Sequence, residues 1–274
     1  VPDEDQGVPV TIRVASLEQQ PFGPLGTKGS ATLSDACSVI SFCIYTADGH
    51  ELYMPQVNQK SSDESFGTLN IKIEEGSYRL VVLAHSSSNP KMSDLSKIEF
   101  QSNSQDRRIA DTFMYSADIT VQKGMQPLDL DLDRVVGKFE IRLTNDPVPA
   151  TVSRIEFEIS GGGSFYLNSN TGFAPSSSSS SRYTDKINVQ PGDSVIEFYT
   201  FVCEGATKIN KVTVNAKDAD GGEFKKVILD NVPIARNRIT RYRGIFFGEA
   251  PINIQASISL NTDWVGTDEY SLND

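Results

Sequence analysis

The stretch LDLDLDRVVGKFEIRL, residues 128–143, decides how this 274-residue chain is expected to fold. Its apolar side chains occupy even positions in the first half and odd positions in the second: Leu128, Leu130 and Leu132, then Phe139, Ile141 and Leu143. Alternation at every second residue is typical of a β-strand with one face on a core. A change of phase turns the buried side over. The stretch therefore predicts one long strand that changes from one core to another at Arg134–Gly137, with Gly137 easing a bulge or bend.

We place a domain boundary at this phase change. It divides the chain into an N-terminal β-sandwich domain, residues 1–134, and a C-terminal β-sandwich domain, residues 135–274. A length of 274 residues suits two ordinary domains, and a hydrophobic content of 38% is enough for two cores. A bulge inside one larger sandwich is the alternative that the same pattern leaves open.

The flanking sequence shows almost no helical periodicity. Short runs of apolar or alternating residues recur instead, separated by turn dipeptides such as Asp48-Gly49 and Pro191-Gly192. Segment Ser16–Ser34, rich in glycine and proline, and the serine run Ser176–Ser181 read as surface loops. Many short strands with this spacing predict an all-β protein built from sandwiches.

Two strictly alternating segments stand near the two ends of the sequence. Their apolar positions are Val8, Val10, Ile12 and Val14 in the first, and Ile252, Ile254, Ala256, Ile258 and Leu260 in the second. A strand near a chain end can leave its sheet, or join the sheet of another molecule, without threading a loop. We therefore treat the first segment as a candidate removable strand and the second as a candidate donor strand.

Lys28 is a candidate site of proteolytic processing. It is the only basic residue between Arg13 and Lys60, and it lies in the loop predicted for Ser16–Ser34. Proteases prefer exposed, loosely packed loops. A trypsin-like cut after Lys28 would free the first alternating segment from the rest of the chain. A lysine that only solubilises the loop is the alternative.

Charge and composition argue against several functions. A net charge of −11 disfavours binding to the phosphate backbone of nucleic acids. No apolar run approaches the roughly 20 residues of a membrane-spanning helix. Neither His50 nor His85 has the spacing of a paired metal ligand or a catalytic motif. We predict a protein without catalytic residues, cofactor or metal, so not an enzyme.

Three further features favour structural roles. The acidic residues Asp129, Asp131 and Asp133 imitate a calcium loop, but Arg134 stands where that loop needs glycine. The three cysteines lie near apolar runs, which predicts buried free thiols: Cys37, Cys43 and Cys203. Trp264, the one tryptophan, is expected to close a sandwich edge, with an exposed sugar-stacking platform as the alternative.

Seven sequence blocks follow one another in an order that resembles the order found in a known family. They are VPVTIRV (8–14), TKGSA (27–31), SVISFCIYTADGHELY (38–53), GSYRLVVLAH (76–85), LDLDLDRVVGKFEIRL (128–143), RNRITRYRGIFF (236–247) and INIQASISLNTDW (252–264). In this order and spacing the chain resembles the fimbrillins of Bacteroidales, the type V pilins with their tip and anchor subunits. The resemblance covers nearly the whole chain.

The resemblance implies two tandem transthyretin-like, Greek-key β-sandwich domains. It implies export as a lipoprotein precursor, display at the outer membrane or cell surface, and membrane contact only through that lipid anchor. In polymerising members an arginine-type protease removes the first strand, and a neighbouring subunit fills the groove. Here the matching basic residue is Lys28 rather than arginine. Anchor members keep their first strand, so the resemblance leaves stalk, tip and anchor roles open.

The expected function is therefore that of a structural subunit of cell-surface fimbriae, or a cell adhesion protein, which assembles by β-strand exchange. Its expected partners are other fimbrial subunits, together with a host or bacterial surface ligand. A surface glycan-binding β-sandwich module is the alternative, and it requires adjacent aromatic side chains on an exposed face. A hydrolase on a β-sandwich is a third hypothesis, but the sequence contains no recognisable set of catalytic residues that would support it.

Overall fold

The computed structural model describes residues 7–18, 32–49, 51–95, 97–100, 109–175, 182–248 and 266–271. Regular structure in these residues consists of strands and one short helix, α1 (Leu33–Ala36), which confirms the all-β fold class. The chain packs as two compact units. The first contains Val1–Phe100, Asp111–Arg134 and Asn168–Gly172, and the second contains Gln101–Ala110, Val135–Leu167 and Phe173–Asp274.

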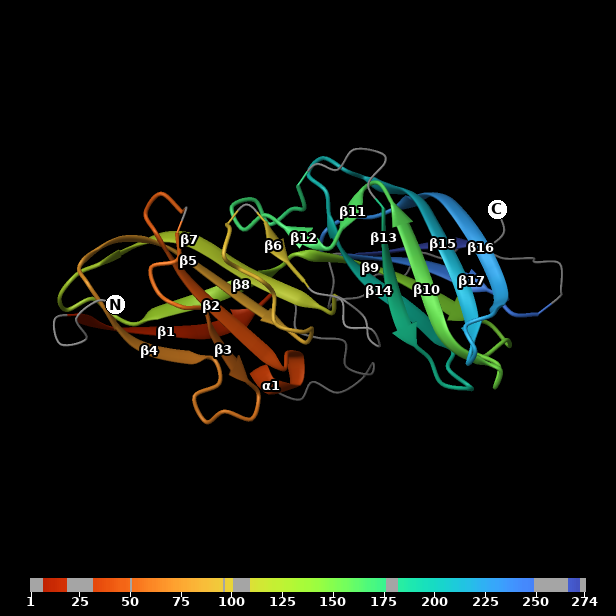
Figure 1. The fold of residues 1–274 in the computed structure, drawn as a ribbon, viewed down its shortest axis with the longest axis horizontal. Coiled ribbons are helices and arrows are strands. Elements are labelled where there is room, and N and C mark those ends of the chain that lie inside the picture. Colours follow the sequence, from red (N-terminus) through yellow and green to blue (C-terminus); the bar gives the residue numbers. More distant parts are fainter. Residues whose placement is uncertain are drawn as a thin grey trace. The chain divides into compact units, whose positions relative to one another are not determined.

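The first unit is built on one seven-stranded sheet (Figure 1). Its strands are β1 (Val8–Leu17), β2 (Val39–Thr46), β3 (Val57–Lys60), β4 (Thr68–Ile73), β5 (Gly76–His85), β7 (Thr112–Val121) and β8 (Leu128–Arg134). Their order in the sheet is β3-β2-β5-β7-β8-β1-β4. A two-residue strand, β6 (Ile98–Glu99), lies between β5 and β7 in the sequence.

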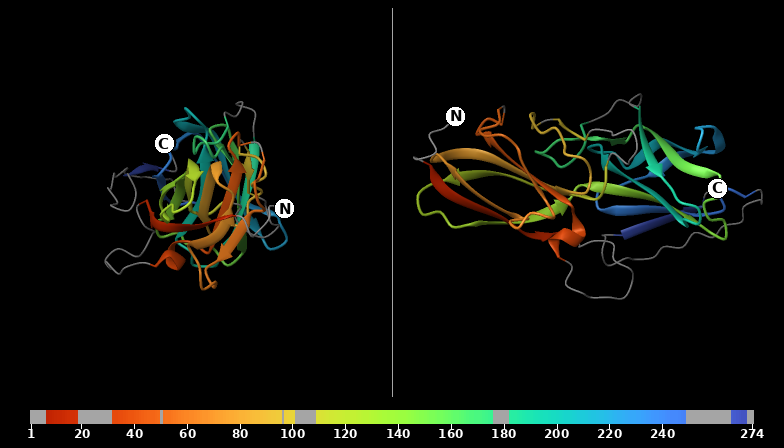
Figure 2. Two further views of the ribbon diagram at one scale, coloured as in Figure 1. Left: turned by 90° about the vertical axis from the view of Figure 1, so that its left-hand side faces the viewer. Right: turned by 60° about the horizontal axis from the view of Figure 1, so that its bottom comes forward.

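This sheet curls over at the junction of β7 and β8. The two strands pair there only through Phe113 with Arg134 and Met114 with Asp133. Buried residues on both sides of the junction, such as Ile12 of β1 and Phe42 of β2, belong to the same hydrophobic core. The sheet therefore forms two layers around one core, which the right-hand view of Figure 2 shows.

The second unit contains two sheets. The four-stranded sheet has the order β13-β10-β15-β16, and the five-stranded sheet has the order β11-β14-β9-β17-β18. Bounds of the strands are β9 (Val136–Leu143), β10 (Val152–Ser160), β11 (Gly163–Ser164), β12 (Tyr166–Leu167), β13 (Arg182–Asn188), β14 (Val195–Val202), β15 (Lys208–Asp218), β16 (Glu223–Pro233), β17 (Arg238–Gly244) and β18 (Gly266–Ser271). The short strand β12 lies in neither of these sheets.

Three phenylalanines join the two sheets of the second unit. Phe139 of β9 and Phe198 of β14 come from the five-stranded sheet, and their ring centroids are 5.0 Å apart. Phe157 of β10 comes from the four-stranded sheet and lies 4.7 Å from the ring of Phe198. All three rings are fully buried. The sheets therefore pack face to face over a shared core, as a β-sandwich does.

The phase change in residues 128–143 coincides with a change of core. Leu130 and Leu132 belong to the core of the first unit, whereas Phe139 and Ile141 belong to the core of the second. The expected role of Gly137 is wrong, because this residue pairs in regular register with Thr200. A Cβ atom at Gly137 would lie 2.7 Å from the carbonyl oxygen of Ala235, so close backbone approach is what requires the glycine.

Cys37, Cys43 and Cys203 are buried free thiols, which confirms the prediction from the sequence. Burial raises the pKa of Cys37 and of Cys43 to about 12, which keeps these two thiols protonated and unreactive. In the described ranges, no helix is long and apolar enough to cross a membrane.

Candidate strand-exchange site

The strand β1 lies inside its sheet and has a neighbour on each side (Figure 1). It pairs antiparallel with β4, where Val10 faces Ile71, and parallel with β8, where Val14 faces Leu130. Backbone groups along both edges of β1 are therefore used in the sheet. Removing β1 would open a gap between β4 and β8 rather than shorten the sheet at its margin.

The apolar side of β1 lies in the core, as its alternation predicted. Val8, Val10 and Ile12 are buried, Ile12 completely, while Val14 is half-buried. The register then shifts between Val14 and Ser16, and Leu17 becomes the next core residue. Sequence reasoning missed Leu17, because a strand with a bulge resumes its alternation in the opposite phase. The sequence signals the shift by the odd position of Leu17, which follows apolar residues at even positions.

The outward side of β1 carries polar links to both neighbours. Arg13 binds the two carboxylate oxygens of Asp129 over 2.6 and 3.0 Å, and Ser16 donates to Asp131 over 2.5 Å. On the other edge Thr11 donates to Asn70 over 2.8 Å. The hydrogen bond from Arg13 lowers the pKa of Asp129. These acidic side chains therefore serve strand pairing, and the described residues contain no cluster of ligands suited to a metal ion.

The end of β1 is tied to the end of β8. Glu18 donates its backbone N–H to the Leu132 carbonyl over 2.8 Å, and its carboxylate accepts from the backbone N–H of Arg134 over 3.0 Å. The Arg134 side chain is completely buried and makes a bidentate pair with Asp111 at 2.9 and 3.0 Å. Its guanidinium group also lies 4.7 Å from the centre of the Phe113 ring. Nothing in the sequence pattern distinguishes this arginine from a solvated one.

The other predicted site residues lie outside the described parts of the chain. These are Lys28, together with the whole candidate donor strand, Ile252, Ile254, Ala256, Ile258 and Leu260. Trp264 and His50 also fall outside. The strand β18 follows the donor segment in the sequence, and it pairs parallel with β17. Its Tyr270 ring lies 5.3 Å from the ring of Tyr242.

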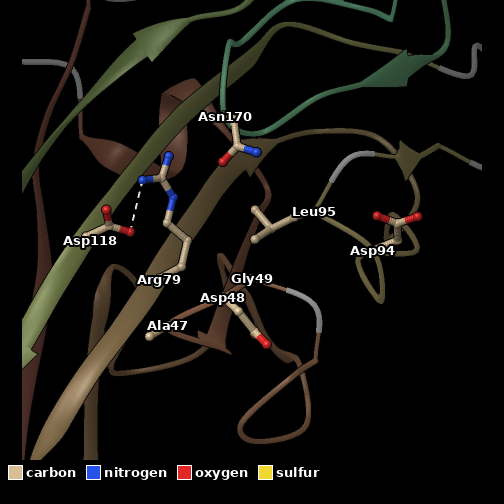
Figure 3. Close-up of a pocket in the computed structure, with 8 residues that line it drawn as sticks. All are labelled: Ala47, Asp48, Gly49, Arg79, Asp94, Leu95, Asp118 and Asn170. Carbon is tan, nitrogen blue, oxygen red and sulfur yellow. Dashed lines mark hydrogen bonds and ion pairs between the residues drawn. The ribbon is translucent and has the colours of Figure 1, made fainter.

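A separate polar cavity of about 330 Å³ lies in the first unit (Figure 3). Within it, Arg79 forms an ion pair with Asp118 over 3.1 Å, while Asp94 stands apart from that pair. The lining residues are Ala47, Asp48, Gly49, Arg79, Asp94, Leu95, Asp118 and Asn170. None of these is aromatic, so the cavity offers no ring on which a sugar could stack. It therefore adds no support to the glycan-binding alternative.

Residues 29–273 match the profile of a family described as a family of unknown function (DUF6562). The chain belongs to this family. Membership covers both compact units, from the residue after Lys28 almost to the end of the sequence. No curated protein matches the chain.

The chain is similar to several solved structures at low sequence identity. A candidate cell adhesion protein from Bacteroides ovatus is 15% identical, with a TM-score of 0.51 over 91% of this chain and 95% of that one. A candidate polysaccharide-binding protein from Bacteroides thetaiotaomicron is 8% identical, with a TM-score of 0.48 over 94% of each chain. The tip fimbrial protein Mfa3 from Porphyromonas gingivalis, with a C-terminal truncation, is 12% identical, with a TM-score of 0.46 over 88% of this chain and 96% of that one.

At the level of the fold, the chain is thus similar to a candidate cell adhesion protein from Bacteroides ovatus. The Bacteroides ovatus structure carries that conclusion, because its similarity extends through nearly all of both chains. At 15% identity the likeness concerns the arrangement of strands, and individual binding residues cannot be carried over from it.

Proposed function

We propose that the protein is a non-enzymatic structural subunit of cell-surface fimbriae, or a related adhesin, whose copies join by exchanging the first strand. The observation that carries this proposal is the position of β1. It precedes every other described strand in the sequence, yet it lies between β4 and β8 in the sheet. The fold shared with a candidate cell adhesion protein supports a role at the cell surface.

The packing of β1 explains why exchange would need a cut. Its most deeply buried side chains, Val8, Val10, Ile12 and Leu17, each contribute about 1.5–3 kcal/mol by leaving water. Each backbone hydrogen bond to β4 or β8 adds about 0.5–1.5 kcal/mol. The strand therefore stays in place while it is covalently attached. Once empty, its groove would expose apolar surface and two rows of unpaired backbone groups, so it would bind a replacement strand.

The proposed cut after Lys28 suits this geometry. The last residue of β1 is Leu17, and the next described element is the helix α1, which begins at Leu33. A cut after Lys28 therefore falls between the two elements and leaves both intact. After it, β1 would be held only by noncovalent contacts.

In this proposal the donor strand, Ile252–Leu260, takes the direction of β1, parallel to β8 and antiparallel to β4. Its alternation matches the pattern from Val8 to Val14, but it contains no shift of phase like the one before Leu17. In the two registers that align its apolar residues with those of β1, a serine takes the position of Arg13. Such a donor would reproduce the apolar contacts of β1 and leave Asp129 without its arginine.

We further propose that the two compact units are two sandwich domains in tandem, of the transthyretin-like type that the resemblance implies. The boundary follows Arg134, the last residue of β8 and of that part of the first unit. The proposal includes export as a lipoprotein precursor and display at the outer membrane. Other fimbrial subunits are then the natural partners, because strand exchange needs a groove in one molecule and a strand from another.

Limited trypsin digestion tests the proposal, with mass spectrometry to locate the cut and light scattering to follow size. We expect a first cut after Lys28, loss of residues 1–28, and growth into polymers. The Lys28→Gln variant is the control, since it should stay uncut in this segment and remain the same size. A clean cut followed by loss of β1 without any growth would contradict strand exchange.

A further inference from the structure

The strand β16 forms an open edge of the second unit (Figure 1). Of the strands that the structure describes, only β15 pairs with it. Two of the large hydrophobic side chains left exposed in the described residues lie on this one strand, Phe224 at 43% exposure and Ile228 at 54%. An edge strand with exposed apolar side chains is a ready template for pairing with another strand.

The outward face of β16 has charges arranged symmetrically about Ile228. Lys226 lies two residues before it and Asp230 two residues after it, and all three side chains are exposed. The intervening residues face the other way: Val227 packs against the core and Leu229 is buried within it. Along β16, the exposed side chains are therefore basic, apolar and acidic in one direction, and acidic, apolar and basic in the opposite direction.

We propose that β16 pairs antiparallel with β16 of a second copy of this chain, about a two-fold axis at Ile228. In this register Ile228 lies opposite Ile228 of the second copy. Lys226 lies opposite Asp230 of the second copy, and the symmetry makes this charged contact twice. Opposite charges directly across an antiparallel pair are stabilising, and like charges are destabilising. The face is thus complementary to itself, as a two-fold interface must be.

Competing registers lose this complementarity. Moving the second strand by four residues would bring Phe224 opposite Ile228, but it would also place Lys226 opposite its own copy. Lysine on an edge strand discourages indiscriminate pairing, and here only a partner with an acidic residue in register relieves that repulsion. Asn231, which has a φ of 54°, interrupts the extended backbone immediately after Asp230 and limits the length of the pairing.

A contact of five paired residues is small compared with stable protein–protein interfaces. We therefore expect the contact to form at high local concentration, for example between adjacent copies crowded together on a surface. It is independent of strand exchange at β1, since β16 lies in the other compact unit and keeps its place whether or not residues 1–28 are removed.

Disulfide trapping tests the register. In Ile228→Cys the two new thiols lie opposite each other on the axis, and mild oxidation should trap a dimer rapidly. Thr184→Cys is the matched control: Thr184 is exposed on β13, at the opposite edge of the same sheet. It should crosslink at least about tenfold more slowly, because the paired edge is three strands away. Equal rates for the two variants would overturn the proposed pairing.

Exchanging the charges of Lys226 and Asp230 tests whether their contact determines the pairing. Sedimentation equilibrium measures the dissociation constant of the dimer. Lys226→Glu should weaken the dimer at least about tenfold, since it opposes carboxylates at two symmetric places. The double variant Lys226→Glu with Asp230→Lys should restore affinity to within about threefold of the wild type, and thermal denaturation checks that each variant folds. A wild type that remains monomeric up to about 1 mM would overturn the proposal. That is also the result expected if Ile252–Leu260 of the same chain occupied this edge.

Discussion

Arg241 of β17 donates from Nε to the carboxylate of Glu140 on β9 over 2.5 Å, and both side chains are almost completely buried. Arg142 donates to the same carboxylate oxygen over 2.6 Å. Lys138 lies 3.3 Å from the other oxygen and also pairs with Glu197. The Glu140 carboxylate therefore balances the positive charge of several side chains. They lie on a face of the sheet that the alternation of β9 alone would assign to solvent.

We expect Glu140→Gln to lower the free energy of unfolding by about 3 kcal/mol, because it removes the negative charge that faces the buried Arg241 and Lys138. Urea unfolding followed by circular dichroism measures the change. Glu158→Gln is the matched control, since Glu158 is about half exposed and lies 3.6 Å from the exposed Arg182. That variant should change stability by less than about 1 kcal/mol. Similar losses for both variants would show that Glu140 makes no special contribution.

The lowered pKa of the Glu140 carboxylate should make the folded protein less stable in acid. Burial alone would raise the pKa of Glu140, but hydrogen bonds from Arg241 and Arg142 and the charge of Lys138 lower it to about 2. A carboxylate with a lowered pKa stabilises the fold fully above its ordinary pKa of about 4.5. This contribution disappears as pH falls from about 4.5 to 2. In that window, the stability difference between wild type and Glu140→Gln should shrink, and a constant difference would contradict the assignment.

His85 should give the stability of the fold a second dependence on pH, at a higher pH. Burial lowers the pKa of His85 to about 4, so the folded protein holds this imidazole neutral, with Nε2 3.3 Å from the Ser41 hydroxyl. An unfolded chain binds the proton at a pH near 6.5. Stability should therefore rise between about pH 4 and 6.5 and level off above, by at most about 3 kcal/mol.

Urea unfolding across this range compares the wild type with His85→Gln. The substitution should remove the part of the slope that lies between about pH 4 and 6.5. The difference between the two proteins isolates this group from the carboxylates, which titrate in both. Parallel stability curves for the two proteins would show that His85 does not titrate on unfolding.

We expect the core contacts of β1 to hold it more strongly than its outward ion pair. Ile12→Ala should lower the free energy of unfolding by about 3 kcal/mol, because Ile12 is completely buried and its loss leaves a cavity. Arg13→Ala should have little effect, since Arg13 and Asp129 are each about half exposed. Denaturant unfolding of the two variants gives the comparison. A larger loss for Arg13→Ala would reverse this ranking.

Gly137→Ala should destabilise the second unit by more than about 1 kcal/mol, because the added methyl group would press on the carbonyl oxygen of Ala235. Gly76→Ala is the matched control. Its nearest contact would be the hydroxyl oxygen of the Tyr78 side chain at 3.3 Å rather than backbone, so stability should stay within about 1 kcal/mol of the wild type. Thermal unfolding of both variants distinguishes backbone approach from a general intolerance of substituted glycines.

The sequence pattern predicted that Val8, Val10 and Ile12 of β1 face the core, and where the buried phase of the chain reverses, but it missed Leu17. It could make these predictions because alternation is a local property of a strand. It could not predict that β1 lies between β4 and β8, since strand order depends on pairings distant in the sequence. It also could not predict the burial of Glu140 and Arg241, because alternation separates the two faces of a sheet without saying what covers the outer one.

Arg134 illustrates the same limit. In the sequence it only interrupts a calcium-like pattern, whereas in the fold it joins Asp111, Phe113 and the end of β1. These partners are brought together by the corner at which β7 meets β8. A corner of this kind has no periodic signature, so the buried arginine could be found only once the chain had been traced in space.

The mixed pairing of β1 gives its groove a direction. Its two neighbours run in opposite directions, and an incoming strand reproduces the native pairings only in the orientation of β1, parallel to β8 and antiparallel to β4. Copies linked through such a groove would be related head to tail. An open polymer of them would have one vacant groove and one free strand at opposite ends, so its growth would be polar. A symmetric contact through β16 would instead be complete with two molecules and would contribute nothing to length.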